Sequence, residues 1–139
     1  MTLKLKNYIT YQLPWQFIML AIFIQSSIGK LSLPDVGIEW FDKIVHFFIY
    51  GLLGLLTVHG LKHASHQLLQ KHYLWISTLI CIFFGATDEI HQFYVPGRFA
   101  SVWDWIADIL GILVFVLVYH LRQQRHIALE HAPLENKKL

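Results

Sequence analysis

Four apolar stretches decide what this chain can fold into. The clearest covers residues 42–61, about 20 residues, which as a helix would just span the roughly 30 Å apolar core of a bilayer. Charged residues make up only 14% of the 139 residues against 55% hydrophobic residues, which is too little polar surface to cover a soluble globule. We therefore expect an all-α integral membrane bundle of four transmembrane helices, near residues 14–29, 42–61, 73–93 and 102–121.

The chain is expected to divide into a four-helix membrane domain, residues 1–121, and a polar cytoplasmic tail, residues 122–139, that needs no structure. The N-terminal run resembles a cleaved signal peptide, because Lys4 and Lys6 precede a short apolar segment. No typical cleavage site follows, and the other apolar segments need a partner helix, so we expect this helix to be retained. Cys81 is the single cysteine, which excludes an intrachain disulfide and predicts a packed thiol.

Basic residues are distributed unevenly between the two predicted sides of the membrane. Cytoplasmic loops of membrane proteins carry an excess of Lys and Arg. We therefore expect both termini in the cytoplasm, with residues 29–41 and the turn at residues 96–98 outside. Eight basic residues fall on the first side (Lys4, Lys6, Lys62, Lys71, Arg122, Arg125, Lys137, Lys138) and three on the other (Lys30, Lys43, Arg98).

The most polar stretch between two apolar runs is residues 87–108, which reads TDEIHQFYVPGRFASVWDWIAD. Pro96 fixes its own φ and Gly97 is free to take a positive φ, a pair that suits a reverse turn. Ser101 and Asp104 have the spacing of a helix cap, so the fourth helix is predicted to start near Val102. The stretch therefore predicts a helical hairpin with its charged residues gathered around the bend.

Ionisable residues recur at a similar depth in three of the predicted helices. A charge at the bilayer centre costs at least about 2.5–3.5 kcal/mol, so such residues normally face the bundle interior or a wet cavity. Their coincidence in depth predicts one shared pocket that faces outward. The candidate members are Asp42, Lys43, His46, Tyr50, Asp88, Glu89, His91, Gln92, Arg98, Asp104 and Asp108.

The residue types in this set allow two interpretations. Asp and Glu beside His suit general acid–base chemistry, and Arg98 is suited to hold an anion. In the alternative, the groups satisfy one another as a structural lock, with Arg98 paired to Glu89 or Asp104 and with no substrate.

Metal binding is the least favoured option, and neither a metal nor another cofactor is expected. Asp88, Glu89 and His91 spread around one helix rather than along one face, so a metal would need ligands from several helices. A second group, at positions 59, 63 and 66, has helical spacing between its histidines but no acidic or cysteine ligand beside it.

The segments DKIVHFFIYGLLG and TDEIHQFYVPGRFASVWDWIADILG resemble the VanZ-like membrane proteins. In that family an Asp-Lys-x-x-His-Phe segment opens the second helix, an Asp-Glu-x-x-Gln segment and a Pro-Gly-Arg turn follow the third, and an Asp precedes a Gly in the fourth. Many relatives carry Asn where this chain has Asp108. The matching positions are Asp42, Lys43, His46, Tyr50, Asp88, Glu89, Gln92, Pro96, Gly97, Arg98, Asp104 and Gly111.

The resemblance implies a small bacterial multi-pass protein of the cell membrane with an envelope role, including low-level resistance to lipid-tailed glycopeptides of the teicoplanin type. It supplies no catalytic residue, so whether the chain is an enzyme stays open. The alternative is an enzyme that acts on a lipid-linked envelope component at the outer leaflet through His46, Asp88 and Glu89. The expected partners are membrane lipid and a lipid-linked precursor or glycopeptide, and no nucleic acid.

Overall fold

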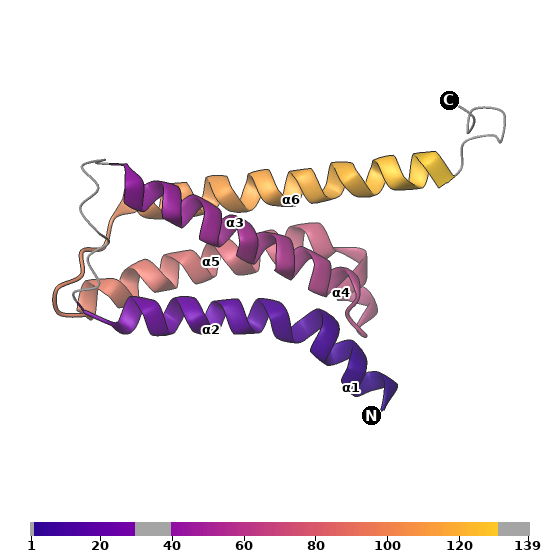
Figure 1. Cartoon of the computed structure of the whole chain (residues 1–139), viewed down its shortest axis with the longest axis horizontal. Helices are drawn as coiled ribbons and strands as arrows, with labels where there is room; N and C mark the ends of the chain where they lie inside the picture. The colour runs from indigo at the N-terminus through magenta and orange to yellow at the C-terminus, as the bar shows by residue number, and fades with distance from the viewer. Residues whose placement is uncertain (1, 30–39, 131–139) are drawn as a thin grey trace.

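The structure is a bundle of long helices that lie side by side (Figure 1). The computed structural model describes residues 2–29 and 40–130, so most of the predicted loop at residues 29–41 lies outside the described part. No strand occurs among the described residues, in agreement with the predicted all-α class. In chain order the helices are α1 (Leu3–Asn7), the π-helix η1 (Tyr8–Gln12), α2 (Leu13–Ser27), α3 (Phe41–Lys62), α4 (Gln67–Lys71), α5 (Tyr73–Tyr94) and α6 (Val102–Glu130).

Three of these helices are long and apolar enough to cross a membrane: α3 and α5 with 22 residues each, and α6 with 29. They correspond to the second, third and fourth predicted spans. The first predicted span corresponds to α2, which has only 15 residues as a regular α-helix. A fourth span therefore remains a prediction.

The N-terminal helical segment contains a wider, π-helical turn just before Pro14. The Leu13 N–H bonds to the Tyr8 carbonyl five residues earlier, which is the pattern of a π-turn. Pro14 has no N–H and its ring crowds the carbonyl of the preceding turn, so a wider turn relieves the clash. The chain bends here, and α1 turns away from the line of α2 (Figure 1).

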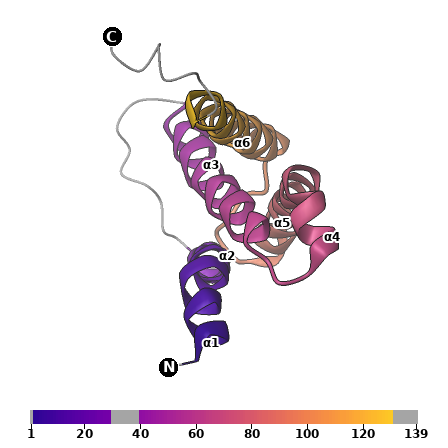
Figure 2. The ribbon, with the colours of Figure 1, turned by 90° about the vertical axis from the view of Figure 1, so that its right-hand side faces the viewer.

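Helices α3 and α6 share the largest helix–helix interface among the described residues. Viewed along the bundle, α5 lies beside this pair, and α2 lies on the far side from α6 (Figure 2). Among the described residues α2 contacts α3 and α5 but not α6. The α3–α6 interface and its contacts with α5 therefore determine what the interior contains.

Glycines allow α3 and α6 to approach closely. A side chain at Gly111 of α6 would collide with the Phe47 backbone carbonyl of α3. A Cβ at Gly54 would lie 3.3 Å from the Cα of Ile112. Small residues let neighbouring backbones meet in this way in membrane helices.

The hairpin between α5 and α6 has the predicted turn. The Arg98 N–H donates to the Val95 carbonyl at 3.1 Å, and Gly97 has a φ of 84°. With Pro96 before a glycine of positive φ, this is a type II turn. Helix α6 then begins at Val102, the predicted start.

Two segments outside the predicted spans are helical, one between α3 and α5 and one at the end of α6. Residues 62–72, which connect the second and third predicted helices, contain the short α4, which His66 caps by accepting a hydrogen bond from the Leu68 N–H. Helix α6 continues past the expected end at residue 121 to Glu130, so the expectation that the tail needs no structure is wrong for residues 122–130. This stretch, RQQRHIALE, is rich in good helix formers, and the helix therefore extends without an apolar face.

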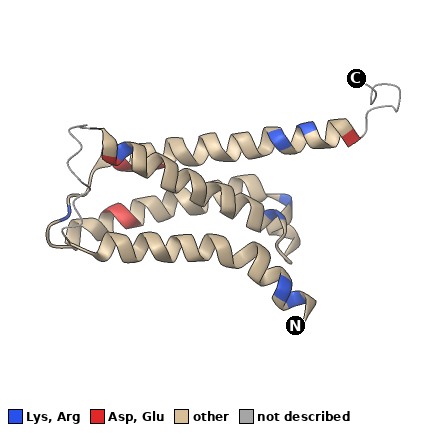
Figure 3. Cartoon of the chain, in the orientation of Figure 1, with Lys and Arg blue, Asp and Glu red and all other residues tan. Residues whose placement is uncertain are grey.

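Charge is separated along the bundle axis (Figure 3). The acidic residues of α3, α5 and the start of α6 gather at the end of the bundle that holds the α5–α6 turn. The opposite end holds both described chain ends and α4 (Figure 1). Of the described basic residues, Lys4, Lys6, Lys62, Lys71, Arg122 and Arg125 belong to this opposite end, and Lys43 and Arg98 to the acidic end.

This charge separation predicts the orientation of the chain in the membrane. In a Cys81→Ala background, we expect Phe99→Cys, in the exposed α5–α6 connection, to react from outside intact cells with a membrane-impermeant thiol reagent. Ser65→Cys, in the exposed connection at the other end, should react only after the cells are opened. The reverse labelling pattern would contradict the predicted orientation.

The close approach of α3 and α6 predicts that Gly111→Ala destabilises the bundle by about 1–3 kcal/mol, the usual cost of overpacking a tight interior site. The measurement is unfolding of the purified protein in detergent micelles. Leu110→Ala is the control, because the Leu110 side chain is exposed on the neighbouring position of α6 and should cost much less. Equal losses in the two variants would contradict the packing.

Candidate functional site

One face of α3 carries a row of polar side chains that bond to carboxylates of α5 and α6. Lys43, His46 and Tyr50 are spaced three and four residues apart, so they lie along the same side of the helix. We call these three residues and their acidic partners the polar seam. The pairs are Lys43 Nζ with Asp104 Oδ1 at 3.0 Å, His46 Nδ1 with Asp108 Oδ1 at 3.0 Å, and the Tyr50 hydroxyl donating to Asp88 Oδ2 at 3.1 Å.

The polar seam is buried within an otherwise apolar bundle. Asp108 is completely buried, and Tyr50 and Asp88 are nearly so. An isolated charge in such surroundings is strongly unfavourable, whereas a paired one is tolerated. Asp88, Asp104 and Asp108 therefore each depend on a partner on α3, and these bonds fix how the three helices are rotated against one another.

Both ends of the seam are largely satisfied by neighbouring groups. Lys43 also pairs with Asp42, at 2.9 Å, and Gln92 donates to Asp88 Oδ2 at 3.0 Å. At Lys43 the groups satisfy one another, as the structural interpretation of the sequence expected, whereas Asp88 Oδ1 is buried and has no hydrogen-bond partner.

Two further buried carboxylate oxygens near the middle of the seam also have no hydrogen-bond partner. Glu89 Oε2 accepts a hydrogen bond from the Ser101 N–H at 2.8 Å, while Glu89 Oε1 accepts none. Asp108 Oδ2 is also without a partner and faces Gly85 of α5, where a Cβ would lie 3.3 Å away. Buried polar atoms in proteins are nearly always paired, so these two oxygens mark the site that the seam leaves incomplete.

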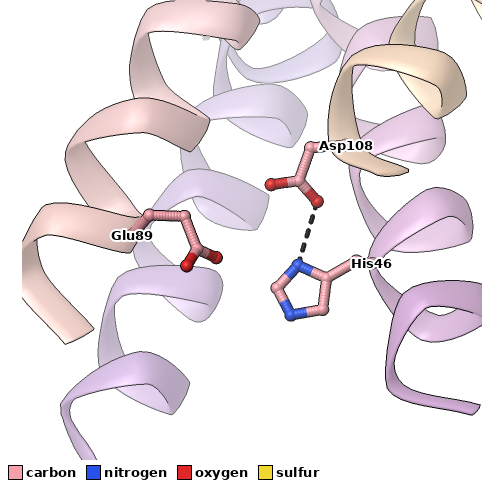
Figure 4. Close-up of side chains that lie close together, drawn as sticks. All are labelled: His46, Glu89 and Asp108. Carbon is pink, nitrogen blue, oxygen red and sulfur yellow. Dashed lines mark hydrogen bonds and ion pairs between the residues drawn. The ribbon is translucent and has the colours of Figure 1, made fainter. Parts of the chain in front are cut away.

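Three residues from three helices form this incomplete part. We call His46, Glu89 and Asp108 the central cluster. A ligand atom of each lies within 4.8 Å of the others. In Figure 4 the Glu89 carboxylate faces the imidazole of His46 across a gap, while Asp108 holds the ring by the hydrogen bond to Nδ1. An imidazole oriented by one carboxylate and faced by a second has the components for proton transfer.

An open, mainly apolar cavity of about 470 Å³ adjoins the central cluster at Glu89. This volume is within the range of small-molecule sites. The cavity lies between the C-terminal half of α5 and the start of α6, and its walls include Glu89, Ile90, Phe93, Ser101, Val102 and Trp105. Phe93 and Val102 are also largely exposed at the bundle surface, so the cavity opens where lipid chains would surround the helices.

Two of the expected pocket residues lie outside the polar seam. His91 contacts Ser27 Oγ through Nε2 at 3.0 Å and stacks on Phe23, so it joins α5 to α2. Arg98 donates to the Gln25 carbonyl at 2.7 Å and forms no ion pair with any described residue. The last carbonyls of a helix lack partners and carry partial negative charge, which explains why the guanidinium binds there.

The expectation that Arg98 pairs with Glu89 or Asp104 therefore does not match the structure. Asp104 is paired with Lys43 and Glu89 with the Ser101 backbone. Sequence reasoning missed the second contact, since a carboxylate that binds a backbone N–H on the next helix leaves no local pattern. It also missed Ser27, whose hydroxyl would only be noticed by pairing α2 with α5.

The histidines considered for a second metal site form no cluster of three ligands in the described part of the chain, although the ring centroids of His59 and His63 lie 4.7 Å apart. His63 stacks on Tyr11 with ring centroids 4.2 Å apart, and His59 Nδ1 contacts the Tyr119 hydroxyl at 3.3 Å. His66 caps α4 instead. These rings take part in helix packing and capping at the end of the bundle opposite the central cluster.

Comparison with known proteins gives two matches. The family model described as VanZ/LLP1 matches residues 2–123, which include every residue of the polar seam. An uncharacterized protein of the fission yeast Schizosaccharomyces pombe, C11E3.10, is 29% identical over 125 residues, which is 83% of this chain and 74% of the yeast protein. No solved structure matches the chain.

The contact between Glu89 and Ser101 predicts different effects for two substitutions. Glu89→Ala removes the acceptor for the Ser101 N–H and should lower the free energy of unfolding by about 1 kcal/mol. Glu89→Gln keeps an acceptor oxygen, so its free energy of unfolding should stay closer to that of the unsubstituted protein. Unfolding in detergent micelles tests the difference, and equal stability of the two variants would show that this bond does not anchor the start of α6.

Proposed function

The chain belongs to the VanZ/LLP1 family, and we propose that it acts in the cell envelope on a lipid-linked component, whose headgroup reaches the central cluster. The lipid chain of that component lies along the cavity beside Glu89. The proposed reaction is acid–base chemistry on the headgroup. The observation that carries the proposal is the imidazole of His46, oriented by Asp108 and faced by the unpartnered oxygen of Glu89.

The roles follow from the contacts. Asp108 holds His46 through Nδ1, which leaves Nε2 free to accept or donate a proton. Glu89 is anchored through Oε2 to the Ser101 N–H, and its carboxylate faces the ring (Figure 4). Asp88, which the sequence offered as an acid or base, is bonded to Tyr50 and Gln92 and serves the packing instead.

A lipid-linked substrate fits the surroundings of the cluster. The cavity is apolar except at Glu89 and Ser101, and its outer wall is exposed where lipid would contact the helices. A molecule with an apolar chain and a polar head could therefore enter from the bilayer with the head directed to the cluster. The side chain of His46 is 20% exposed, so the cluster also has access from the end of the bundle.

The charge separation along the bundle supports placing the site at the outer leaflet of the cell membrane. More of the described basic residues belong to the end opposite the α5–α6 turn, and the positive-inside rule places that end in the cytoplasm. The relative in a yeast supports a substrate that is not confined to bacteria, and membrane-bound lipid carriers satisfy that condition.

Binding without chemistry is the second candidate, and the apolar cavity is the observation that favours it. A lipid-tailed glycopeptide of the teicoplanin type, or another lipid, would place its chain in the cavity, and resistance would follow from sequestration. Turnover separates the candidates. Purified protein incubated with a lipid extract from cells that lack it should convert many equivalents of one lipid-linked component if it is an enzyme, and only bind about one equivalent if it is not.

Two histidines at the same end of the bundle provide a matched test of the site. His46→Gln should abolish complementation of a deletion strain, measured as susceptibility to envelope-directed compounds, because it removes the ionisable ring from the central cluster. His91→Gln should complement, because His91 contacts Ser27 and Phe23 outside the cluster. Membrane abundance is measured for both variants. Complementation by His46→Gln at normal abundance would contradict the proposed site.

A further inference from the structure

The central cluster combines an imidazole and two carboxylates from three helices. One ligand atom of each residue lies within 4.8 Å of the other two, so a single ion between them can contact all three. We propose that His46, Glu89 and Asp108 bind one divalent transition-metal cation between α3, α5 and α6. The sequence alone made a metal the least favoured option because it required ligands from several helices, and the fold supplies that arrangement.

The two unpartnered oxygens are an independent reason to place a cation there. Glu89 Oε1 and Asp108 Oδ2 are buried and accept no hydrogen bond. The Glu89 residue is 8% exposed and the Asp108 residue is fully buried. Figure 4 shows both carboxylates directed to the space beside the His46 ring. Oxygen atoms in this condition require a positive partner, since an unsatisfied buried carboxylate is strongly unfavourable.

The charge balance of this end of the bundle points the same way. Lys43 is the only cationic side chain in the polar seam apart from His46, and it already contacts two carboxylates. Arg98 is directed to the Gln25 carbonyl. The carboxylates around these groups are Asp42, Asp88, Glu89, Asp104 and Asp108. A divalent cation at the central cluster would offset much of this excess negative charge where the low dielectric makes it most costly.

The donor types indicate the class of metal. Imidazole suits Zn²⁺ and similar transition metals, and carboxylates suit Mn²⁺ and other hard cations, so the mixed set favours Zn²⁺ or Mn²⁺ over Ca²⁺ and Mg²⁺. Three protein ligands leave positions open for water or substrate, as in catalytic rather than structural sites. A metal held by all three residues takes the place of the hydrogen bond between His46 Nδ1 and Asp108 Oδ1.

The inference deepens the proposed function and rests on it for the use made of the metal. A phosphate or carboxylate headgroup would be repelled by the carboxylates of the seam alone. With a cation in the cluster, the same headgroup gains a positive contact, and a metal-bound water can supply the nucleophile for hydrolysis. His46 would then be a metal ligand, and the bound water, made more acidic by the metal, would release its proton to solvent and become the nucleophile.

The test is direct metal binding by the purified full-length protein, from which any affinity tag has been removed. The protein is stripped with chelator in detergent micelles and dialysed against Zn²⁺ or Mn²⁺ at about 10 µM free metal. We expect one bound metal per chain by elemental analysis. We also expect a higher unfolding temperature with metal, since a ligand that binds only the folded state stabilises it.

Substitutions assign the metal to the cluster. Glu89→Gln and Asp108→Asn keep shape but remove charge, and each should weaken binding about a hundredfold or more, because even outer-shell partners cost 10–100-fold. Asp88→Asn is the matched control, being a buried acid next to Glu89 with other partners, and should bind normally. A triple variant of the exposed His63, His66 and His72 to Gln should also bind normally.

The outcomes separate this inference from the proposed function. If the stripped, unsubstituted protein binds no metal at this concentration, or if the triple histidine variant abolishes binding while Glu89→Gln and Asp108→Asn do not, the metal site is wrong. That conclusion does not depend on whether a variant folds. If metal binds as predicted but lipid extracts are neither converted nor bound, the proposed function is wrong and the metal site stands.

Discussion

The hydrogen bond between His46 and Asp108 connects the two helices around which the bundle is built. Asp108 is fully buried on α6, and its only hydrogen-bonded partner among the described residues is the imidazole on α3. In apolar surroundings a carboxylate without that partner would destabilise the helix pair. The neighbouring glycines let the backbones come close enough for the bond to form, as the contact of Gly111 with Phe47 illustrates.

The same interaction links folding to the proposed chemistry. The seam satisfies Lys43 and Tyr50 at either side, so the rotation of α3 against α5 and α6 is fixed by bonds that take no part in a reaction. Between these fixed points, Glu89 and Asp108 keep one oxygen each without a partner. Because several other bonds already fix the helix positions, the bundle can hold reactive groups in an otherwise unfavourable environment.

Much of this arrangement could be predicted from the sequence. Apolar segment length predicted the three helices that can span a membrane, and the Pro96-Gly97 pair predicted the turn. The shared depth of His46 and Asp108 on separate helices predicted that they meet, because charged groups in an apolar bundle seek one another. Segment length and turn residues are local features of the sequence, and the cost of burying a charge depends on residue type, so all of them can be recognised without a structure.

The rest depended on three-dimensional contacts that leave no such pattern. Arg98 was expected beside carboxylates, but the carbonyls at the end of α2 are closer and also attract a cation. Glu89 was expected to act as an acid or base or to pair with Arg98, whereas one of its oxygens accepts a hydrogen bond from the Ser101 backbone. These contacts of Arg98 and Glu89 decide which carboxylate oxygens remain without a partner. The sequence could therefore suggest a polar pocket but not the geometry of a cation site.

The central claim is that His46 and Asp108 form one buried unit between α3 and α6. A double-mutant cycle with His46→Gln and Asp108→Asn, measured as free energy of unfolding in detergent micelles, tests it most directly. The account predicts a coupling energy between the two substitutions, in the range of about 0.5–3 kcal/mol seen for residues in direct contact. Additive effects, with no coupling beyond about 0.5 kcal/mol, would contradict the account because they would mean that the two side chains do not act as a pair.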